Sequence, residues 1–416
     1  MTASNFQKYP LFHHGFSPKR RRLTDPWEEV ASEDICKPAT ELEKNSWNGF
    51  CEIESEPALF NVMLREFGVR GVHVQEVMSL DEEGVGYLEK PVYGLIFLFR
   101  WREDDAEKQE ASCPDGIWFA NQTAGNSCAS VALLNIVNNI PGIDLGENLR
   151  RFRDFTMPFT PALRGDAINN FEFVKHVHNS FARKMDILNS DLQLQSEATS
   201  KKRSKSQDPN ELESGFHFIA FMPAMGQVWK FDGLERQPQA LGECSEDDWL
   251  KLAMPNIIDR MAAYTEDSIE FSILGVVRDP LSDLVQQLAV NVRSLKVIQD
   301  RLLAQEGSAL EREASLAALN ETVLGPEASL GLTQADIEAA ITSVGIQMCQ
   351  DSEQLRRYQQ ELSQAQVGLR GRIQEQQQAQ REDEDHATGR RYDYGPAIRK
   401  WLRFLARKQL LAELLQ

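Results

Sequence analysis

Apolar residues change their spacing several times along the chain, and each spacing predicts a different element. In "EPALFNVMLREFG" they recur at helical intervals from Leu59 to Phe67, and Gly68 follows as a stop. Residues 92–101, "VYGLIFLFRW", form a continuous apolar run, which is typical of a strand buried on both faces. Residues 128–139 predict a buried helix, and residues 167–184 predict another.

A long polar insertion interrupts this pattern. Residues 191–215 lose their apolar side chains almost completely, and a loop of this size inside a compact domain is usually functional or disordered. Three strands are expected after it, at residues 216–222, 228–232 and 269–277. The domain is expected to close near Asp279.

The last third of the chain has a helical pattern. Apolar residues follow alternating steps of four and three from Leu281 to Leu302, and a second periodic run from Leu355 to Leu369 leads into a Gln/Glu-rich linker. A two-helix hairpin and an oligomeric coiled coil both fit this pattern. The final segment, residues 389–416, is amphipathic and basic. It fits a docking helix, or a terminal helix that caps its own domain.

Composition limits the possible partners. Residues 1–44 have no periodicity and predict a disordered tail. The net charge of -18 argues against direct nucleic-acid binding. Two basic clusters, "PKRRR" at residues 18–22 and "KKRSK" at residues 201–205, are either nuclear-import signals or solvated loops.

The cysteines and the amino terminus indicate the compartment. The six cysteines lie far apart without a CxxC pair, and the first residues lack the layout of a secretory signal. No apolar run approaches the roughly 20 residues that cross a bilayer. We therefore expect a reduced intracellular protein with free thiols, without membrane association. Its expected location is the cytoplasm and nucleus, and no cofactor or metal is expected.

One cysteine has the setting of a nucleophile. Cys128 follows Asn126 and Ser127, two good helix-capping residues, so it falls in the first turn of the buried helix. Unpaired N–H groups and the positive dipole end favour a thiolate there. The alternative is a thiol that simply packs in the core.

A base for this cysteine can be sought among seven histidines. His176 and His178 lie on an amphipathic helix, where a solvent-facing or capping role is expected. His217 interrupts the apolar strand "GFHFIAFMP" and must find a hydrogen-bonding partner. A hairpin centred between residues 224 and 225 places it opposite Asp232. The pair is either structural or part of a catalytic site.

Together these residues form a possible Cys–His–Asp constellation. Asp232 would orient His217, His217 would take the proton of Cys128, and the thiolate would attack a carbonyl. The backbone N–H of Cys128 and the side-chain amide of Gln122, six residues upstream, can hold the oxyanion. Without the neighbouring cysteine, Gln122 would be an ordinary loop residue.

These motifs resemble a known family. "NQTAGNSCASVALLNIV" is similar to the active-site segment of the ubiquitin C-terminal hydrolases, which are papain-like cysteine peptidases, and "GFHFIAFMPAMGQVWKFDGL" is similar to their histidine strand and aspartate. The resemblance covers residues 45–277 almost continuously. It implies an α+β fold with a central antiparallel sheet flanked by helices. It also assigns the nucleophile to Cys128, the base to His217, the orienting acid to Asp232 and the oxyanion donor to Gln122.

The resemblance also implies a domain layout. A catalytic domain is expected at residues 45–279, with the family's crossover loop at about 190–215; the loop's length and basic residues suggest a loose gate for substrates. A helical extension follows at residues 280–388. "RRYDYGPAIRKWLRFLARKQLLAELL" resembles the end of the long members, in which a deubiquitinase-adaptor domain of a proteasomal or chromatin complex binds a helical extension. The proteasome-associated type is closer, because this chain lacks the long central insertion of the chromatin-associated member.

The expected function is thus a thiol-dependent ubiquitin hydrolase that acts within a proteasomal or nuclear complex. A non-catalytic ubiquitin-binding scaffold, recruited through its helical end, is the alternative. A papain-like protease of ordinary peptides is disfavoured, because the signature of that group around its cysteine is missing.

Overall fold

The computed structural model describes residues 39–100, 108–190, 216–245, 248–262, 271–305, 319, 322–349, 351–392 and 394–408. The chain forms two compact units. The larger extends from Pro38 to Asp393, and the smaller contains Met1–Lys37 and Tyr394–Gln416. The insertion at residues 191–215 and nearly all of the predicted tail lie outside the described residues.

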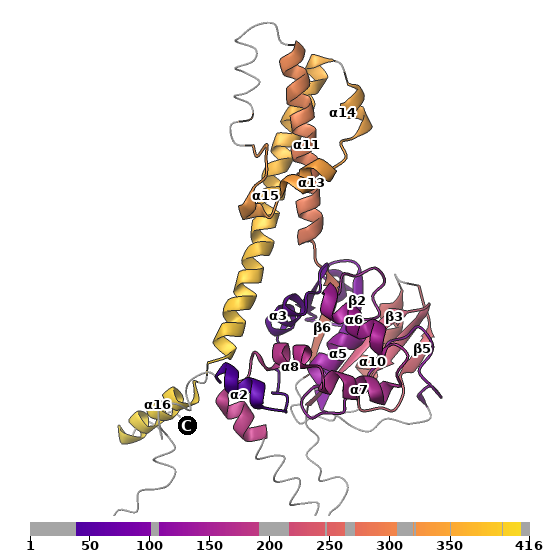
Figure 1. Cartoon of the computed structure of the whole chain (residues 1–416), viewed down its shortest axis with the longest axis vertical. Helices are drawn as coiled ribbons and strands as arrows, with labels where there is room; N and C mark the ends of the chain where they lie inside the picture. Colours follow the sequence, from indigo (N-terminus) through magenta and orange to yellow (C-terminus); the bar gives the residue numbers. More distant parts are fainter. Residues whose placement is uncertain are drawn as a thin grey trace, which may run out of the picture. The chain divides into compact units, whose positions relative to one another are not determined.

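A six-stranded sheet is the centre of the larger unit, with antiparallel pairing throughout and the order β1-β6-β2-β3-β4-β5 (Figure 1). This confirms the expected fold class. The strands are β1 (Val72–Glu76), β2 (Val92–Arg100), β3 (Phe216–Ala224), β4 (Gln227–Phe231), β5 (Gln239–Glu243) and β6 (Ser272–Arg278). The two edge strands, β1 and β5, are too short and too weakly patterned to be predicted from the sequence.

Helices cover both faces of the sheet. One core packs the sheet against helices that include α3 (Pro57–Phe67), α5 (Cys128–Val137), α6 (Gly146–Thr156) and α8 (Glu172–Asn179). The other core lies between the sheet and α4 (Glu82–Gly86) and α10 (Trp249–Ala262). Along β3, Phe218 packs in the first core and Ile219 in the second. The strand is therefore buried on both faces, as its continuous apolar run requires.

Two expectations about helices are wrong. The helix expected at residues 167–184 is divided into α7 (Pro161–Asn169) and α8, because Asn170 donates its side-chain amide to the Asp166 carbonyl and ends α7. Phe171 then takes an extended conformation and stacks on Phe152 at 4.6 Å. The tail was expected to reach residue 44, but α2 (Glu41–Ser46) begins earlier with a capping box from Thr40.

The helical extension forms a hairpin within the chain. Helix α11 (Leu281–Gln305) runs antiparallel to α15 (Ser352–Arg390) (Figure 1). The chain segment that connects them contains the short elements η4 (Ala328–Leu330), α13 (Gln334–Ala339) and α14 (Val344–Met348). Inside the seam, Gln366 donates to Asn291 at 3.0 Å. Of the two possibilities, the hairpin is the one observed.

The Gln/Glu-rich segment is not a linker, as was expected, but the second half of α15, a continuous helix of 39 residues. Gln, Glu and Arg are good helix formers, and the segment contains no proline. The far end of α15 packs on α3, where Arg65 pairs with Asp383 and Glu384, both at 3.0 Å. The extension is thus attached to the sheet-containing domain at two places along the chain, through α11 and through α15.

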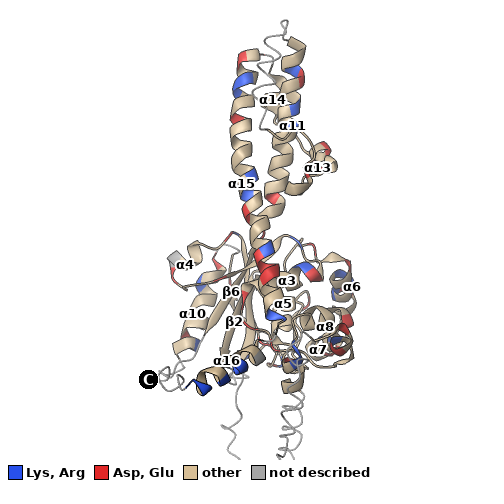
Figure 2. Ribbon diagram, turned by 90° about the vertical axis from the view of Figure 1, so that its left-hand side faces the viewer, with Lys and Arg blue, Asp and Glu red and all other residues tan. Residues whose placement is uncertain are grey.

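The described part of the smaller unit is helix α16 (Gly395–Arg407). Figure 2 shows several lysine and arginine residues, in blue, along this helix. Four of its large apolar side chains are exposed, those of Ile398, Trp401, Leu402 and Phe404, whereas Leu405 is buried. Among the described residues of the whole chain, no helix is both long and apolar enough to cross a membrane.

Candidate active site

Cys128 is the first residue of α5, as predicted, and it is half-buried although the rest of the helix is buried. Asn126 takes a left-handed conformation with φ 59°, which asparagine tolerates better than most residues. Ser127 occupies the N-cap position, but its hydroxyl donates to the Ala124 carbonyl at 2.9 Å and does not cap the helix. The expected side-chain cap is therefore absent. The positive end of the helix remains open beside the thiol.

His217 and Asp232 meet through their side chains. His217 Nε2 lies 2.7 Å from Asp232 Oδ1, and the two residues are 3% and 1% exposed. The Asp232 oxygen also accepts the backbone N–H of Leu234 at 3.0 Å. Because Nε2 is bound to the carboxylate, Nδ1 is the ring nitrogen that remains for Cys128.

The hairpin that joins these residues has a different register from the expected one. Ala224 pairs with Gln227, so β4 is shifted by two residues relative to a turn centred between residues 224 and 225. Met225 and Gly226 are the two turn residues, with φ 52° and 77°. A two-residue turn of this handedness needs positive φ at both positions, which fixes Gly226 as its second residue. A shift of two residues keeps every side chain on the same face of the sheet. The predicted contact between His217 and Asp232 is therefore made although the predicted register was wrong.

The charged forms of the pair are favoured. Burial acts to lower the pKa of His217, but hydrogen bonds with Asp232 and Cys128 raise it to about 9. Burial acts to raise the pKa of Asp232, yet its hydrogen bond with His217 and the positive charge there hold it below its ordinary value. At neutral pH the site therefore contains an imidazolium between a carboxylate and the Cys128 side chain.

Gln122 is placed by its backbone. Its N–H donates to the Gly233 carbonyl at 2.8 Å, one residue beyond Asp232. A Cβ on Gly233 would lie 3.1 Å from both the Cβ and the N of Gln122, so glycine permits this close approach. The side-chain Nε2 of Gln122 donates to the Ala124 carbonyl at 3.1 Å, and its Oε1 is buried without a partner. All four predicted residues thus lie on three segments that contact one another.

Comparison with known proteins identifies the family of the chain. The model of the ubiquitin carboxyl-terminal hydrolase family 1 matches residues 50–262, which are 213 of the 416 residues. The chain belongs to this family. The expected family is thereby confirmed, and it is a family of cysteine-dependent ubiquitin hydrolases.

Individual relatives cover the same region. The ubiquitin carboxyl-terminal hydrolase isozyme L5 of Dictyostelium discoideum is 37% identical over 240 residues, which are 58% of this chain and 65% of that protein. The ubiquitin carboxyl-terminal hydrolase ubh-4 of Caenorhabditis elegans is 33% identical over 281 residues, or 67% of this chain and 77% of that protein. The chain thus matches slightly less than two thirds of the Dictyostelium relative's length.

Among solved structures, the crystal structure of the Trichinella spiralis UCH37 catalytic domain bound to ubiquitin vinyl methyl ester matches 56% of this chain and 96% of that chain. The sequence identity is 33% and the TM-score is 0.45.

For one histidine of this member of the ubiquitin hydrolase family, the predicted position is wrong. His178, expected to face solvent or cap a helix, is completely buried. Its Nε2 lies 2.8 Å from the Cys51 carbonyl and its Nδ1 lies 2.7 Å from the hydroxyl of Ser130 on α5. Burial lowers the pKa of His178 to about 4, so it is neutral. His176, on the same helix, is exposed as expected.

Two asparagines that support the loop before Cys128 were also missed. Asn135 on α5 bonds both backbone groups of Ala120, at 2.8 and 3.2 Å. Asn121 donates to the Glu235 carbonyl at 2.6 Å, beyond Asp232. Asn135 had a detectable signal, because it is a polar residue inside the apolar segment "VALLNIV" and must find a partner there.

Proposed function

We propose that this chain hydrolyses the bond after the C-terminal glycine of ubiquitin, with Cys128 as the nucleophile. The observation that carries the proposal is the imidazole of His217, which lies between Asp232 and Cys128 and is held in its charged form. A charged imidazole beside a thiol at an open helix end stabilises the thiolate, the reactive form of cysteine.

The first step forms an acyl-enzyme. The thiolate of Cys128 attacks the glycine carbonyl, and the negative charge moves to the carbonyl oxygen. The backbone N–H of Cys128 and the side-chain amide of Gln122 donate to that oxygen. For this, Gln122 exchanges its hydrogen bond to the Ala124 carbonyl for one to the substrate. As the intermediate collapses, the carbon–nitrogen bond breaks and His217 gives its proton to the leaving amine.

The second step releases ubiquitin. Neutral His217 takes a proton from water, the hydroxide attacks the thioester, and the thiolate of Cys128 leaves. Asp232 keeps Nε2 as the donor in both steps, so that Nδ1 always faces the reaction. No step needs a metal or an organic cofactor.

The finer parts of the proposal concern partners and place. We propose that conjugates are admitted past the crossover loop at about residues 190–215, and that an adaptor domain of a proteasomal or nuclear complex binds the C-terminal end. Helix α16 supports this, because Trp401 and Phe404 are 58% and 55% exposed on a helix rich in arginine and lysine. A partner with an apolar groove and acidic edges fits such a helix.

The test is turnover of a fluorogenic amide of ubiquitin. Cys128→Ala is expected to abolish cleavage and to leave ubiquitin binding largely intact, whereas Cys113→Ala, which changes another half-buried thiol, is expected to retain cleavage. Turnover by Cys128→Ala would refute the assignment. Binding of ubiquitin without turnover by the unaltered chain would favour the scaffold alternative.

A further inference from the structure

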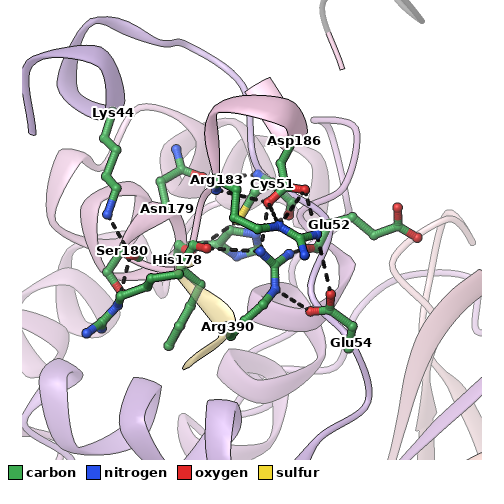
Figure 3. A network of polar contacts seen from close by, with 12 residues as sticks. Lys44, Cys51, Glu52, Glu54, His178, Asn179, Ser180, Arg183, Asp186 and Arg390 are labelled. Carbon is green, nitrogen blue, oxygen red and sulfur yellow. Dashed lines mark hydrogen bonds and ion pairs between the residues drawn. The ribbon is translucent and has the colours of Figure 1, made fainter. Parts of the chain in front are cut away.

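Arg390, the last residue of α15, is buried in the catalytic domain with its side chain 7% exposed (Figure 3). Its guanidinium contacts two carboxylates, Glu54 and Asp186, each at 2.7 Å. It also donates to the backbone carbonyls of Glu52 at 2.9 Å and Phe181 at 3.1 Å. One side chain from the extension therefore joins two segments of the catalytic domain.

The two segments are joined by further hydrogen bonds beside Arg390. Asn179, at the end of α8, accepts the backbone N–H of Cys51 at 3.1 Å and donates to the Gly49 carbonyl at 2.9 Å. His178, the preceding residue, contacts the Cys51 carbonyl (Figure 3). Residues 49–54 are thus attached to the end of α8 by Asn179 and His178, and to residues 181–186 by Arg390.

His178 extends this connection to the active-site helix. A carbonyl only accepts hydrogen bonds, so the proton of neutral His178 is on Nε2, facing Cys51, and Nδ1 accepts from the Ser130 hydroxyl. Ser130 lies on α5, two residues after Cys128. Arg390 reaches residues 51–54 through contacts that are partly exposed, since the Glu54 side chain is 53% exposed. From Cys51 onward the path to the helix that carries the thiol consists of buried hydrogen bonds, through His178 to Ser130, which leave little freedom for adjustment.

We propose that Arg390 is a positioning residue for Cys128, which acts through residues 51–54, His178 and Ser130. The end of the helical extension would then belong to the support of the active site. The inference rests on the proposed function. An arginine suits this role because its planar group carries five donors, enough for two carboxylates and two carbonyls, whereas a lysine has three donors on one atom.

A second arginine provides a matched control. Arg65 on α3 forms another charged contact with α15, through Asp383 and Glu384. No hydrogen bond found for Arg65 leads to residues 51–54, His178 or Ser130. Arg65→Ala therefore weakens the attachment of α15 without touching the path to α5.

The experiment measures two properties of the full-length chain. In Arg390→Ala we expect kcat on the ubiquitin amide to fall about 10-fold or more at unchanged KM, because a small displacement of a nucleophile costs rate more than binding. We expect the alkylation rate of Cys128 by iodoacetamide, followed by mass spectrometry of its peptide, to fall as well. In Arg390→Lys, kcat and the alkylation rate should lie between those of Arg390→Ala and the unaltered protein. Arg65→Ala should resemble the unaltered protein in both.

A double-mutant cycle distinguishes transmission from general destabilisation. If Arg390 acts through Ser130, Arg390→Ala should have a clearly smaller effect on alkylation in a Ser130→Ala background than alone. Equal effects in the two backgrounds, or an Arg390→Ala protein that alkylates and turns over like Arg65→Ala, would overturn the proposal. If Arg390→Ala does not fold, the same cycle is made with Arg390→Lys. Alkylation needs no ubiquitin, so it tests this inference even if the proposed hydrolysis fails.

Discussion

His217 and Asp232 contact each other at 2.7 Å although they are not partners in the strand ladder. His217 pairs with Phe99 on β2, and Asp232 follows the last residue of β4. The carboxylate thus approaches the ring from beyond the end of its strand. Because the backbone N–H of Leu234 holds it there, it can orient the imidazole although the two residues are not paired across the hairpin.

Replacing Asp232 with asparagine tests the need for its charge. Asp232→Asn keeps the shape but removes the partner of the imidazolium, so we expect kcat on the ubiquitin amide to fall on the order of 10²- to 10⁴-fold. Glu235→Gln is the control, since it neutralises a neighbouring buried carboxylate that pairs with Lys230. Equal losses in both variants would mean that buried charge in general, rather than this pair, is required.

The pH dependence of His217 follows from its raised pKa of about 9. The unfolded chain loses this proton near pH 6.5, so the stabilisation by the ion pair is complete below about 6.5 and is lost as pH rises through about 9. The lowered pKa of Asp232 has the opposite effect: Asp232 stabilises the fold at pH values above its ordinary pKa, and this stabilisation is lost in acid. Titration of the ring by NMR should have its midpoint near 9, and near 6.5 or below in Asp232→Asn. A midpoint near 6.5 in the unaltered protein would contradict the charged pair.

Gln122 is expected to act on the transition state alone. In the resting site its amide donates to the Ala124 carbonyl, and in the proposed mechanism it turns to the substrate oxygen only as the oxyanion forms. We expect kcat to fall about 10²- to 10³-fold with little change in KM. Gln122→Glu has the same shape but places an acceptor at the oxyanion, and should be at least as inactive. A change below about 3-fold would remove Gln122 from the mechanism.

Neutral His178 predicts a loss of stability in acid. The unfolded chain binds a proton on this residue below about pH 6.5, whereas the folded protein resists it down to about 4. The free energy of unfolding should therefore fall by about 3 kcal/mol over this interval from His178 alone. His178→Gln can keep both hydrogen bonds without titrating, so denaturation curves should separate from those of the unaltered protein between pH 6.5 and 4. Parallel curves would show that His178 is not held neutral.

Met225 offers a gain in stability. It holds a positive φ of 52° in the turn between β3 and β4, a conformation that asparagine adopts at lower cost. Met225→Asn should raise the free energy of unfolding by about 0.5–1 kcal/mol, measured by urea denaturation. Its sulfur lies 3.0 Å from where a Cβ on Gly116 would be, so a loss of stability would show that this packing outweighs the backbone strain.

The sequence predicted well what depends on local patterns. The run of apolar residues in β2, the start of α5 at Cys128 and the buried position of His217 follow from the spacing of apolar residues, although the side-chain cap expected before Cys128 does not form. The prediction of the hairpin register was wrong because it placed the turn centre by spacing alone. The observed turn is placed by the positive φ that Gly226 allows.

What failed most clearly depends on contacts between distant segments. The local pattern of its helix indicates a surface position for His178. It is buried because the distant residues Cys51 and Ser130 pack against it and form hydrogen bonds with its ring. The second half of α15 is polar and looks like a linker, but α3 covers part of it and Ala387 joins the main core. Local periodicity contains no information about such partners.

Helix α15 must satisfy two angular conditions at once. Ile373 faces α11, and fourteen residues later Ala387 faces the catalytic domain, on nearly the same side of a helix that advances about 100° per residue. Deleting one residue between them would rotate Arg390 by about a quarter turn and withdraw it from Glu54 and Asp186. The length of this rod can therefore vary only in steps of about seven or eleven residues, which return the helix to the same phase.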